Sequence, residues 1–436
     1  MRRVVIVTLD GLRRDQISEQ TTPNLTAFAR QAECFADYRT VFPSCTRVVS
    51  ASLATGCFPA RHGLQGNSVA LIEDGRLVLR DAGHPDFLQH KRRVTGTSLA
   101  MPTLAERLKE RGGAVIFSNV SPGAAYAHDP DGHGHVYHRA GSFGPGRIAV
   151  PTEDRLDVTL DSAGDRRMTE RFADEVLIRR RPALAVLWLG EPDHMQHEAP
   201  LGSPEYLAAV VAADTHAGLV IATVERLRAA GDDILLLIGS DHGHQSVSGI
   251  IDIDAELIAA GLKQGPGSDD VMSVSNGTSA LIYVDPNHAA MQPALRDFFA
   301  ARDWVGALFG PGDLAQIGQK AEGGLAFAVS MAASEAPNAF GVPGSSLAAK
   351  PAMGKPDRLG CGQHGGLGRY EQSPFLMASG SGFRPGTIRN EPARIVDIAP
   401  TALRHLGLDA TGMDGAPLQN SAVAADTEEM RWPASR

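Results

Sequence analysis

The feature that most constrains the fold is a set of short apolar runs, several of which end in a carboxylate. Residues 4–9 are continuous, β-branched and apolar, and Asp10 follows them directly. This pattern is typical of a parallel strand that is buried on both faces. Similar runs at residues 114–118, 183–189 and 233–238 alternate with segments of helical character. The alternation predicts an α/β fold around a central, mostly parallel sheet.

Helices are predicted between these strands from their start signals and their periodicity. Pro23 suits the first turn of a helix that runs to about Cys34, and Thr103 precedes a second helix. Longer helices are predicted over residues 166–181 and 205–230, the latter with an apolar face. These segments supply the layers that a buried parallel sheet requires.

The amino-acid composition of the chain changes between residues 266 and 356, where Gly, Ala, Pro and Ser are frequent. Apolar runs at residues 280–284 and 325–329 have the character of strands. We interpret this region as an inserted smaller domain that caps the core. The core is then predicted to comprise residues 1–265 and 357–436.

Charge and hydropathy restrict the classes of partner. The 436-residue chain has a formal net charge of −9, which argues against binding to a nucleic-acid polymer. An acidic chain can still take a phosphate substrate where metal ions dominate the local field. The first apolar run is too short for a signal peptide, and no stretch approaches the roughly 18 apolar residues of a membrane span. We therefore expect a cytoplasmic location and no membrane partner, and the oligomeric state stays open.

Three of the predicted strands end in an acidic residue: Asp10, Asp193 and Asp241. Because the carboxyl ends of parallel strands share one edge of a sheet, these carboxylates should converge. Two of them bring a histidine at short spacing, namely His197 four residues after Asp193 and His242 directly after Asp241. The pattern predicts a cluster of metal-ligating side chains at that edge.

His364, in a Gly-rich turn, adds a further imidazole to this set. Mixed histidine and carboxylate ligands suit Zn²⁺, with Mn²⁺ as the alternative. Six such ligands exceed the needs of one tetrahedral ion and indicate two divalent ions roughly 4 Å apart. Two-metal sites of this kind support displacement at phosphorus.

Thr46 is the candidate nucleophile for such a displacement. It follows Phe42-Pro43-Ser44-Cys45 and precedes a run of small and apolar residues that predicts a helix. A helix start offers unpaired backbone N–H groups and a partial positive charge, which suit an attacked phosphoryl group. A plain N-cap role is the structural alternative for this residue.

The order of these motifs resembles that of the alkaline phosphatase superfamily. Within it, the sequence is most similar to the type I phosphodiesterase and nucleotide pyrophosphatase family, over residues 1–265 and 357–410. The motifs that carry the resemblance are Asp10-Gly11, Thr46, Arg61-His62-Gly63, Asp193-x-x-x-His197, Asp241-His242-Gly243, His364-Gly365 and Val396-Asp397-Ile398-Ala399-Pro400-Thr401.

The resemblance implies an alkaline-phosphatase-like fold, with helices on both faces of the sheet, and a two-step hydrolysis of phosphodiester or nucleotide pyrophosphate bonds. Thr46 would attack phosphorus and form a phospho-threonine intermediate, and Asn67 would hydrogen-bond a phosphoryl oxygen. One Zn²⁺ would be held by Asp193, His197 and His364. The other would be held by Asp10, Asp241, His242 and the Thr46 hydroxyl.

The sequence departs from the family pattern at two places. Thr46 is followed by Arg47-Val48-Val49 where the family has Phe-Pro-Asn, and Gln196 stands where the family has Gly before the metal-binding histidine. Residues 193–197 also look similar to phosphonoacetate hydrolase, a sister branch that cleaves a carbon–phosphorus bond. Arg47 could bind an extra anionic group of a phosphorylated or phosphonate substrate, or it could solvate the helix start.

Other functions are weighed against this one. A sulfatase would need a Cys/Ser-x-Pro-x-Arg pattern, which residues 44–47 lack. A phosphomonoesterase stays an alternative, with Arg47 as the one convincing candidate for the arginine that would bind a dianionic phosphate. A non-catalytic metal-binding protein is the alternative from a different class. The loop at residues 128–138, rich in His and Asp, is interpreted as solvated in preference to a lid or a further metal site.

Overall fold

The computed structural model describes residues 2–351 and 358–420, so residues 352–356 of the predicted insert and 421–436 of the predicted core lie outside it. Its main sheet has ten strands in the order β21-β2-β20-β11-β1-β10-β6-β7-β8-β9. At its centre, β1 pairs in parallel with β10 and β11, and β10 pairs in parallel with β6. The central strands are β1 (Arg2–Leu9), β6 (Ala114–Ser118), β10 (Leu184–Leu189) and β11 (Asp233–Gly239). The mostly parallel sheet is therefore confirmed.

The outer strands of this sheet are short. They are β2 (Glu33–Phe35), β7 (His135–Tyr137), β8 (Phe143–Gly144), β9 (Ile148–Ala149), β20 (Leu376–Ser379) and β21 (Thr387–Arg389). Strand β20 runs antiparallel to both β11 and β2, which the apolar run alone did not predict. A small bridge of β3 (Tyr38–Arg39) with β22 (Ala393–Arg394) lies apart from the main sheet.

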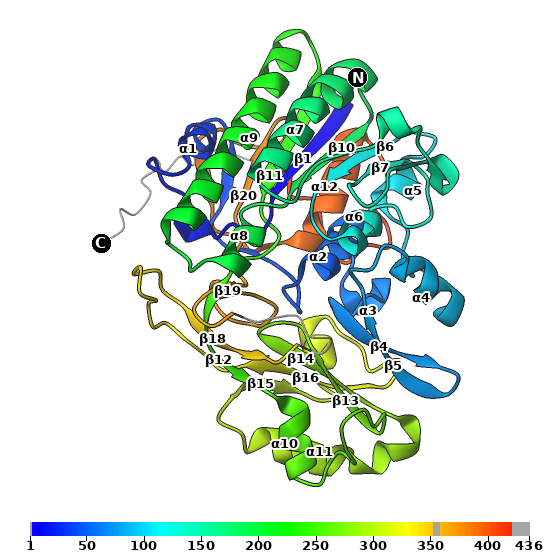
Figure 1. Ribbon diagram of the computed structural model, residues 1–436. Coiled ribbons are helices and arrows are strands. Elements are labelled where there is room, and N and C mark those ends of the chain that lie inside the picture. Colours follow the sequence, from blue (N-terminus) through cyan, green and yellow to red (C-terminus); the bar gives the residue numbers. More distant parts are fainter. Residues whose placement is uncertain (1, 352–357, 421–436) are drawn as a thin grey trace.

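Helices cover both faces of the sheet, as expected (Figure 1). One face is covered by α1 (Pro23–Ala29), α7 (Ser162–Arg171), the π-helix Phe172–Arg180 and α9 (Pro204–Ala229). The other is covered by α2 (Thr46–Thr55), α5 (Leu104–Leu108), α6 (Pro122–Ala127) and α12 (Ile398–Leu406). The side chains of β1 alternate between these layers: Val5 and Val7 pack with α1 and α9, and Val4 and Ile6 pack with α2 and α12.

Two helix predictions need correction. Helix α1 ends at Ala29 and not near Cys34, because Glu33–Phe35 is drawn into the sheet as β2. Helix α9 is long and apolar enough by length and composition to span a membrane, so the expectation that no stretch has this character is wrong for α9. Its face with Val210, Ala217 and Val220 is buried against the sheet.

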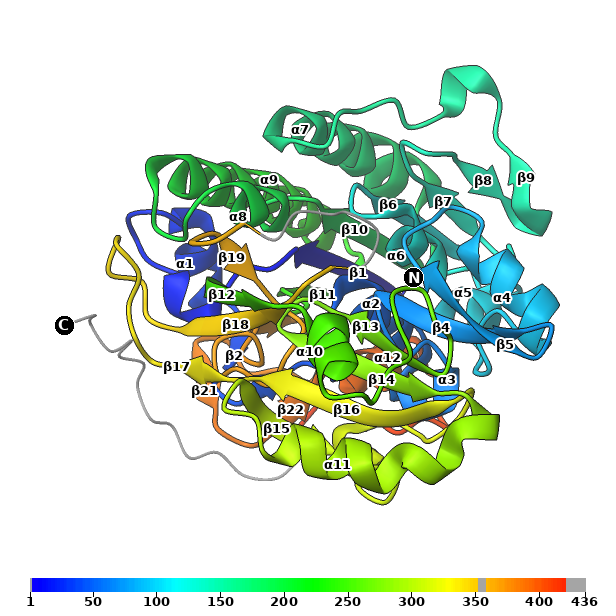
Figure 2. The ribbon, with the colours of Figure 1, turned by 60° about the horizontal axis from the view of Figure 1, so that its bottom comes forward.

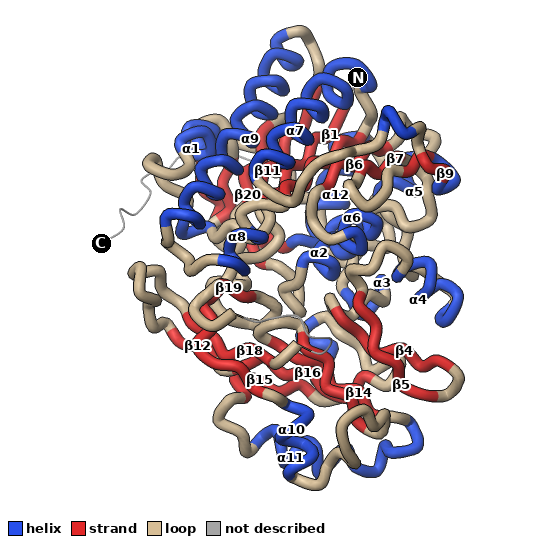
Figure 3. Tube along the Cα trace, in the orientation of Figure 1, coloured by secondary structure: helices blue, strands red, loops and turns tan. Residues whose placement is uncertain are grey.

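A second lobe lies beside the carboxyl ends of the central strands (Figures 2 and 3). It contains the sheet β17-β18-β12-β19 and the antiparallel sheet β13-β14-β16-β15, and the hairpin β4-β5 contacts it. The hairpin strands are β4 (Ser68–Glu73) and β5 (Arg76–Asp81). The strands of the lobe itself are β12 (Gln245–Ile251), β13 (Val271–Ser275), β14 (Ser279–Val284), β15 (Val305–Phe309), β16 (Leu325–Met331), β17 (Ala333–Ser334), β18 (Ser345–Ala349) and β19 (Gly362–Gln363). The remaining helices are α3 (Pro59–His62), α4 (Phe87–Thr95), α8 (Asp193–Glu198), α10 (Ile253–Ala259) and α11 (Gln292–Ala300).

This lobe has its own apolar core around Leu257, Ile282 and Phe327. Strand β12 and helix α10 belong to it although they precede residue 266 in the chain. The division of the chain at residues 266–356 stays a prediction.

Candidate active site

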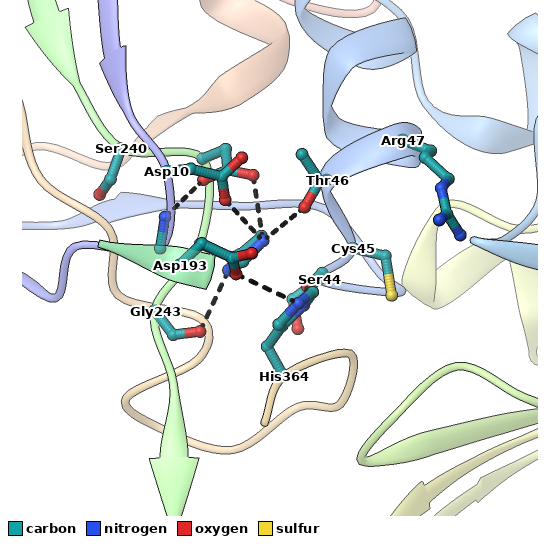
Figure 4. A network of polar contacts seen from close by, with 12 residues as sticks. Asp10, Ser44, Cys45, Thr46, Arg47, Asp193, Ser240, Gly243 and His364 are labelled. Carbon is teal, nitrogen blue, oxygen red and sulfur yellow. Dashed lines mark hydrogen bonds and ion pairs between the residues drawn. The ribbon is translucent and has the colours of Figure 1, made fainter. Parts of the chain in front are cut away.

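The three acidic residues that follow the central strands meet at one edge of the main sheet. Figure 4 shows two of them, Asp10 and Asp193, close to Thr46 and His364. Asp10 follows β1, Asp193 begins α8 after β10, and Asp241 follows β11. Backbone contacts hold these turns together, because Gly11 N donates to Asp241 Oδ1 at 3.0 Å and Asp193 N donates to the Asp10 carbonyl at 3.1 Å. Asp10 and Asp241 are fully buried. The parallel topology thus produces the convergence that the sequence predicts.

Three histidine side chains gather around one oxygen of Asp193, which makes a group of four residues. Its Oδ1 lies 3.5 Å from His197 Nε2, 3.6 Å from His364 Nε2 and 3.1 Å from His244 Nε2. The other ring nitrogen of His364 fixes the orientation of the ring, because Nδ1 lies 2.6 Å from the carbonyl oxygen of Ser44. The first three of these residues are the set that the sequence assigned to one ion, and His244 is an addition.

The second group lies around His242 Nε2. This atom is 3.1 Å from Asp241 Oδ2, 3.5 Å from Asp10 Oδ1 and 3.1 Å from Thr46 Oγ1. The two groups adjoin, since the His242 and His364 rings stack with centroids 3.7 Å apart. All seven residues that the sequence proposed as metal ligands therefore lie in one cluster, although their role as ligands stays a proposal.

The cluster fits divalent cations. Within the described residues, Asp10 Oδ1, Asp193 Oδ1, Asp241 Oδ2 and His244 Nε2 are buried without a hydrogen-bond partner. Carboxylate oxygens in this state are costly unless a cation or a donor satisfies them. Beside imidazole nitrogens they form two candidate metal sites, one of Asp193, His242, His244 and His364 and the other of Asp10, Asp241 and His242.

The electrostatics agree with a cation at this place. Burial, followed by the carboxylates of Asp241 and Asp193, raises the pKa of Asp10 well above its usual value. Burial also lowers the pKa of His244 to about 4, and burial with neighbouring imidazoles holds the pKa of His364 well below its usual value. Both rings are therefore neutral at pH 7 and keep a lone pair for a metal.

Thr46 is the first residue of α2, and Cys45 occupies the N-cap position. The N-cap alternative for Thr46 is therefore wrong. The Thr46 hydroxyl makes a hydrogen bond with His242 Nε2. The nucleophile candidate thus lies where the start of a helix meets the metal-ligand cluster.

Asn67 and Arg47 are fixed to each other beside Thr46. The backbone N–H of Arg47 donates to Asn67 Oδ1 at 3.1 Å, and Arg47 Nη1 donates to the Asn67 carbonyl at 2.7 Å. Arg47 also pairs with Asp81 at 3.2 Å and donates to Ser121 Oγ at 3.1 Å. Its guanidinium therefore does not solvate the helix start and is already neutralised by a carboxylate.

A pocket of about 400 Å³ opens at the cluster. Its walls include Thr46, Arg47, Asn67, Asp193, His364 and Arg139. No Phe, Tyr or Trp of the described residues lines it. The pocket therefore offers no broad aromatic face for stacking a nucleobase.

Three features of the site escaped the sequence analysis. His244, two residues after His242, carries no ligand motif of its own, yet it is fully buried with its Nε2 3.1 Å from Asp193 Oδ1. Trp188 Nε1 donates to Asp10 Oδ2 at 2.8 Å and so orients that carboxylate. The third feature is Arg139, which follows β7 and for which no local motif exists.

The His- and Asp-rich loop is ordered and partly internal. His128 and His138 are buried and residues 135–137 form β7, so the interpretation as a solvated loop is wrong for these residues. Among the described residues, the groups that could hold a metal include no member of this loop. The loop builds one edge of the main sheet and leads to Arg139 in the pocket wall.

Comparisons with known proteins agree with this architecture. Murine ectonucleotide pyrophosphatase/phosphodiesterase 5 is similar in structure with a TM-score of 0.67 and 17% sequence identity, over 95% of this chain and 97% of that chain. The human protein of the same name gives a TM-score of 0.63 with 18% identity over 95% and 97% of the two chains. Phosphonoacetate hydrolase from Sinorhizobium meliloti, solved in complex with phosphonoformate, has a TM-score of 0.65 and 15% sequence identity, over 93% of this chain and 95% of that chain.

These structural likenesses, at low identity, establish the alkaline-phosphatase-like fold. A search by sequence among curated proteins finds no match. The family model described as type I phosphodiesterase / nucleotide pyrophosphatase matches residues 4–308, more than half of the chain. The chain belongs to the type I phosphodiesterase/nucleotide pyrophosphatase family.

Proposed function

We propose that this protein is a two-metal hydrolase that cleaves phosphodiester or nucleotide pyrophosphate bonds through a phospho-threonine intermediate. Membership of the family makes it a phosphoric-ester hydrolase, and the family is metal-dependent. The observation that carries the finer proposal is the Thr46 hydroxyl at the start of α2, 3.1 Å from His242 Nε2 and beside the buried carboxylates. A threonine-to-alanine variant of the murine structural relative is described as inactive and was solved with AMP, which supports the nucleophile assignment by analogy.

Asp193, His197 and His364 would hold one divalent ion, with His244 as a further ligand. Asp10, Asp241, His242 and Thr46 would hold the other. When bound, two ions of Zn²⁺ (or Mn²⁺) supply Lewis acidity that lowers the pKa of the threonine hydroxyl and neutralises charge on the phosphoryl group.

The remaining steps follow from the protein's own residues. Thr46 Oγ1 forms a bond to phosphorus while the bond to the leaving oxygen breaks, and water then cleaves the phospho-threonine and restores the hydroxyl. The start of α2 adds the partial positive charge of a helix N-terminus beside Thr46. Since Asn67 Oδ1 accepts the N–H of Arg47, its amide Nδ2 is left to donate to a phosphoryl oxygen.

Cleavage of a carbon–phosphorus bond in a small phosphonate is the second candidate. The compact pocket without an aromatic wall favours it, because a nucleotide would need a surface for its base. A phosphonoacetate hydrolase is also among the similar structures. We propose a small phosphorylated or phosphonate substrate in the cytoplasm for either reaction, and neither a membrane nor a nucleic-acid polymer as partner.

The test is a substrate panel on the metal-loaded protein, with metal content measured in the same samples. We expect two ions per chain and faster cleavage of bis(p-nitrophenyl) phosphate than of the monoester. Thr46→Ala should lower turnover by at least about a thousandfold, whereas Thr55→Ala, at the other end of α2, serves as the matched control. Phosphate release from phosphonoacetate alone would select the second candidate. Full metal content without turnover of any substrate would indicate a non-catalytic metal-binding protein.

A further inference from the structure

Arg139 is a cation in the wall of the active-site pocket that forms no ion pair with a described residue, and the buried carboxylate of Asp165 acts on it without direct contact. Arg139 is half-buried and lines the same pocket as Thr46 and Asp193. No carboxylate among the described residues lies within ion-pair distance of it, in contrast to Arg47, which pairs with Asp81 at 3.2 Å. The other two carboxylates of the pocket, those of Asp10 and Asp193, belong to the metal-ligand cluster. A desolvated arginine without a counter-ion is unfavourable unless an anion binds there.

The guanidinium is anchored through a single nitrogen. Arg139 Nη1 donates to Asn119 Oδ1 at 2.9 Å, to the Asn119 carbonyl and to the Val120 carbonyl at 3.0 Å. No hydrogen bond within the described part of the chain uses its Nε or Nη2. These two atoms form the edge of the guanidinium that matches a carboxylate or phosphate with two parallel hydrogen bonds.

Asn119 is itself held rigidly. It is fully buried, and its Nδ2 donates to Asp165 Oδ1 at 2.8 Å and to the Thr159 carbonyl at 2.9 Å. Asp165 in turn accepts the backbone N–H groups of Gly190 and Glu191, which lead from β10 to Asp193. Arg139 is therefore positioned relative to the candidate metal cluster by a continuous hydrogen-bonded chain.

We propose that Arg139 binds a second anionic group of the substrate, a carboxylate or a phosphate, while the phosphoryl group lies at Thr46. This inference rests on the proposed function, which places the reacting phosphorus at Thr46. The pocket of about 400 Å³ lies at the small end of the range for ligand sites, so the linker between the two anionic groups is short. The substrate class is thus a compact phosphoester or phosphonate with two anionic ends.

The test measures binding, so that it does not depend on turnover. Calorimetry is run on the zinc-loaded protein in a Thr46→Ala background, which prevents turnover, and the form with Arg139 intact serves as the wild type. It compares phosphonoacetate with phosphonoacetamide, which has nearly the same size but lacks the second charge. Methylenediphosphonate provides the phosphate counterpart, and metal content is measured after each titration to exclude stripping. We expect phosphonoacetate or methylenediphosphonate to bind at least about tenfold more tightly than phosphonoacetamide, as hydrogen bonds to charged groups predict. Whichever dianion shows the larger preference identifies the second group.

Variants assign the preference to Arg139. Arg139→Gln should reduce the ratio to below about threefold, Arg139→Lys should give an intermediate ratio, and Arg30→Gln, an exposed arginine far from the pocket, serves as the control. An unchanged ratio in Arg139→Gln overturns the proposal. If that variant does not fold, Arg139→Lys takes its place, and an unchanged affinity ratio in Arg139→Lys overturns the proposal. A ratio of dianion to phosphonoacetamide affinity near one in the wild type overturns the proposal without any variant. Charge-selective binding, combined with no hydrolysis of any substrate by the protein that retains Thr46, would refute the proposed function and leave the assignment of Arg139 standing.

Discussion

His62 provides a prediction whose magnitude can be worked out from the structure. The residue is fully buried, and both ring nitrogens are occupied: Leu64 N donates to Nδ1 at 3.1 Å, and Nε2 lies 2.9 Å from Ser52 Oγ of the nucleophile helix α2. Only a neutral ring with its proton on Nε2 satisfies both contacts. Burial, followed by the nearby cation of Lys91, lowers the pKa of His62 from 6.5 to about 3.

A lowered histidine pKa in the folded state means that stability is lost as the pH falls. The contribution is fully present above the unfolded pKa of 6.5 and declines by about 1.4 kcal/mol per pH unit until about pH 3. At pH 5 the expected loss of unfolding free energy from this one group is about 2 kcal/mol. The loss acts directly on the packing of α2, which carries Thr46.

The assay is urea unfolding of the metal-free protein at a series of pH values between 7.5 and 5. Other buried histidines titrate in the same range, so the informative quantity is the difference between wild type and His62→Gln. The variant should lose stability on acidification less steeply than wild type, by about 2 kcal/mol at pH 5. His288→Gln, which removes an exposed histidine, is the control. Equal slopes for wild type and His62→Gln would refute the reasoning.

Further predictions concern the metal cluster and the pocket. His244→Ala should lower the affinity for one metal ion about tenfold or more, measured by competition with a chelator, because its buried Nε2 has no partner but Asp193 and the ion; unchanged affinity would remove His244 from the ligand set. Gly11→Ala should weaken metal binding in the same assay, since a Cβ there would come within 2.5 Å of the His244 ring and Gly11 has φ +69°; a fully loaded variant would contradict this. Asp81→Asn should destabilise the protein by about 1–2 kcal/mol in thermal unfolding by releasing Arg47, and an unchanged melting temperature would show that the pair is unimportant.

The centre of the fold and the convergence of the site could be predicted from the sequence, because both follow from parallel topology. Once residues 4–9, 183–189 and 233–238 are identified as neighbouring parallel strands, the positions of Asp10, Asp193 and Asp241 at one edge are a geometric consequence. The predicted helix runs too far, to about Cys34, because the pairing of the short strand β2 with the sheet overrides the local helix signals.

Other features depend on contacts that no local pattern encodes. A single histidine such as His244 has the same sequence signal whether it faces solvent, a core or an ion, and only burial next to Asp193 distinguishes these cases. Arg139 becomes noticeable only when the structure shows that it lines the pocket and that none of the described carboxylates forms an ion pair with it. Whether Thr46 is an N-cap could be decided only from the structure, in which α2 begins at Thr46 and the N-cap is the preceding residue, Cys45.

The site is assembled from segments that lie far apart along the chain. His364 contacts the carbonyl oxygen of Ser44 across 320 residues, and Asp10 precedes both. During synthesis the amino-terminal ligands are therefore made long before the last one, so the complete metal site cannot form until the ribosome has passed residue 364. If the proposed ligands hold metal, we expect metal loading to be a late event that reports on completed folding. The loop-closure entropy of the longest contacts must then be lost before a bound ion can stabilise them.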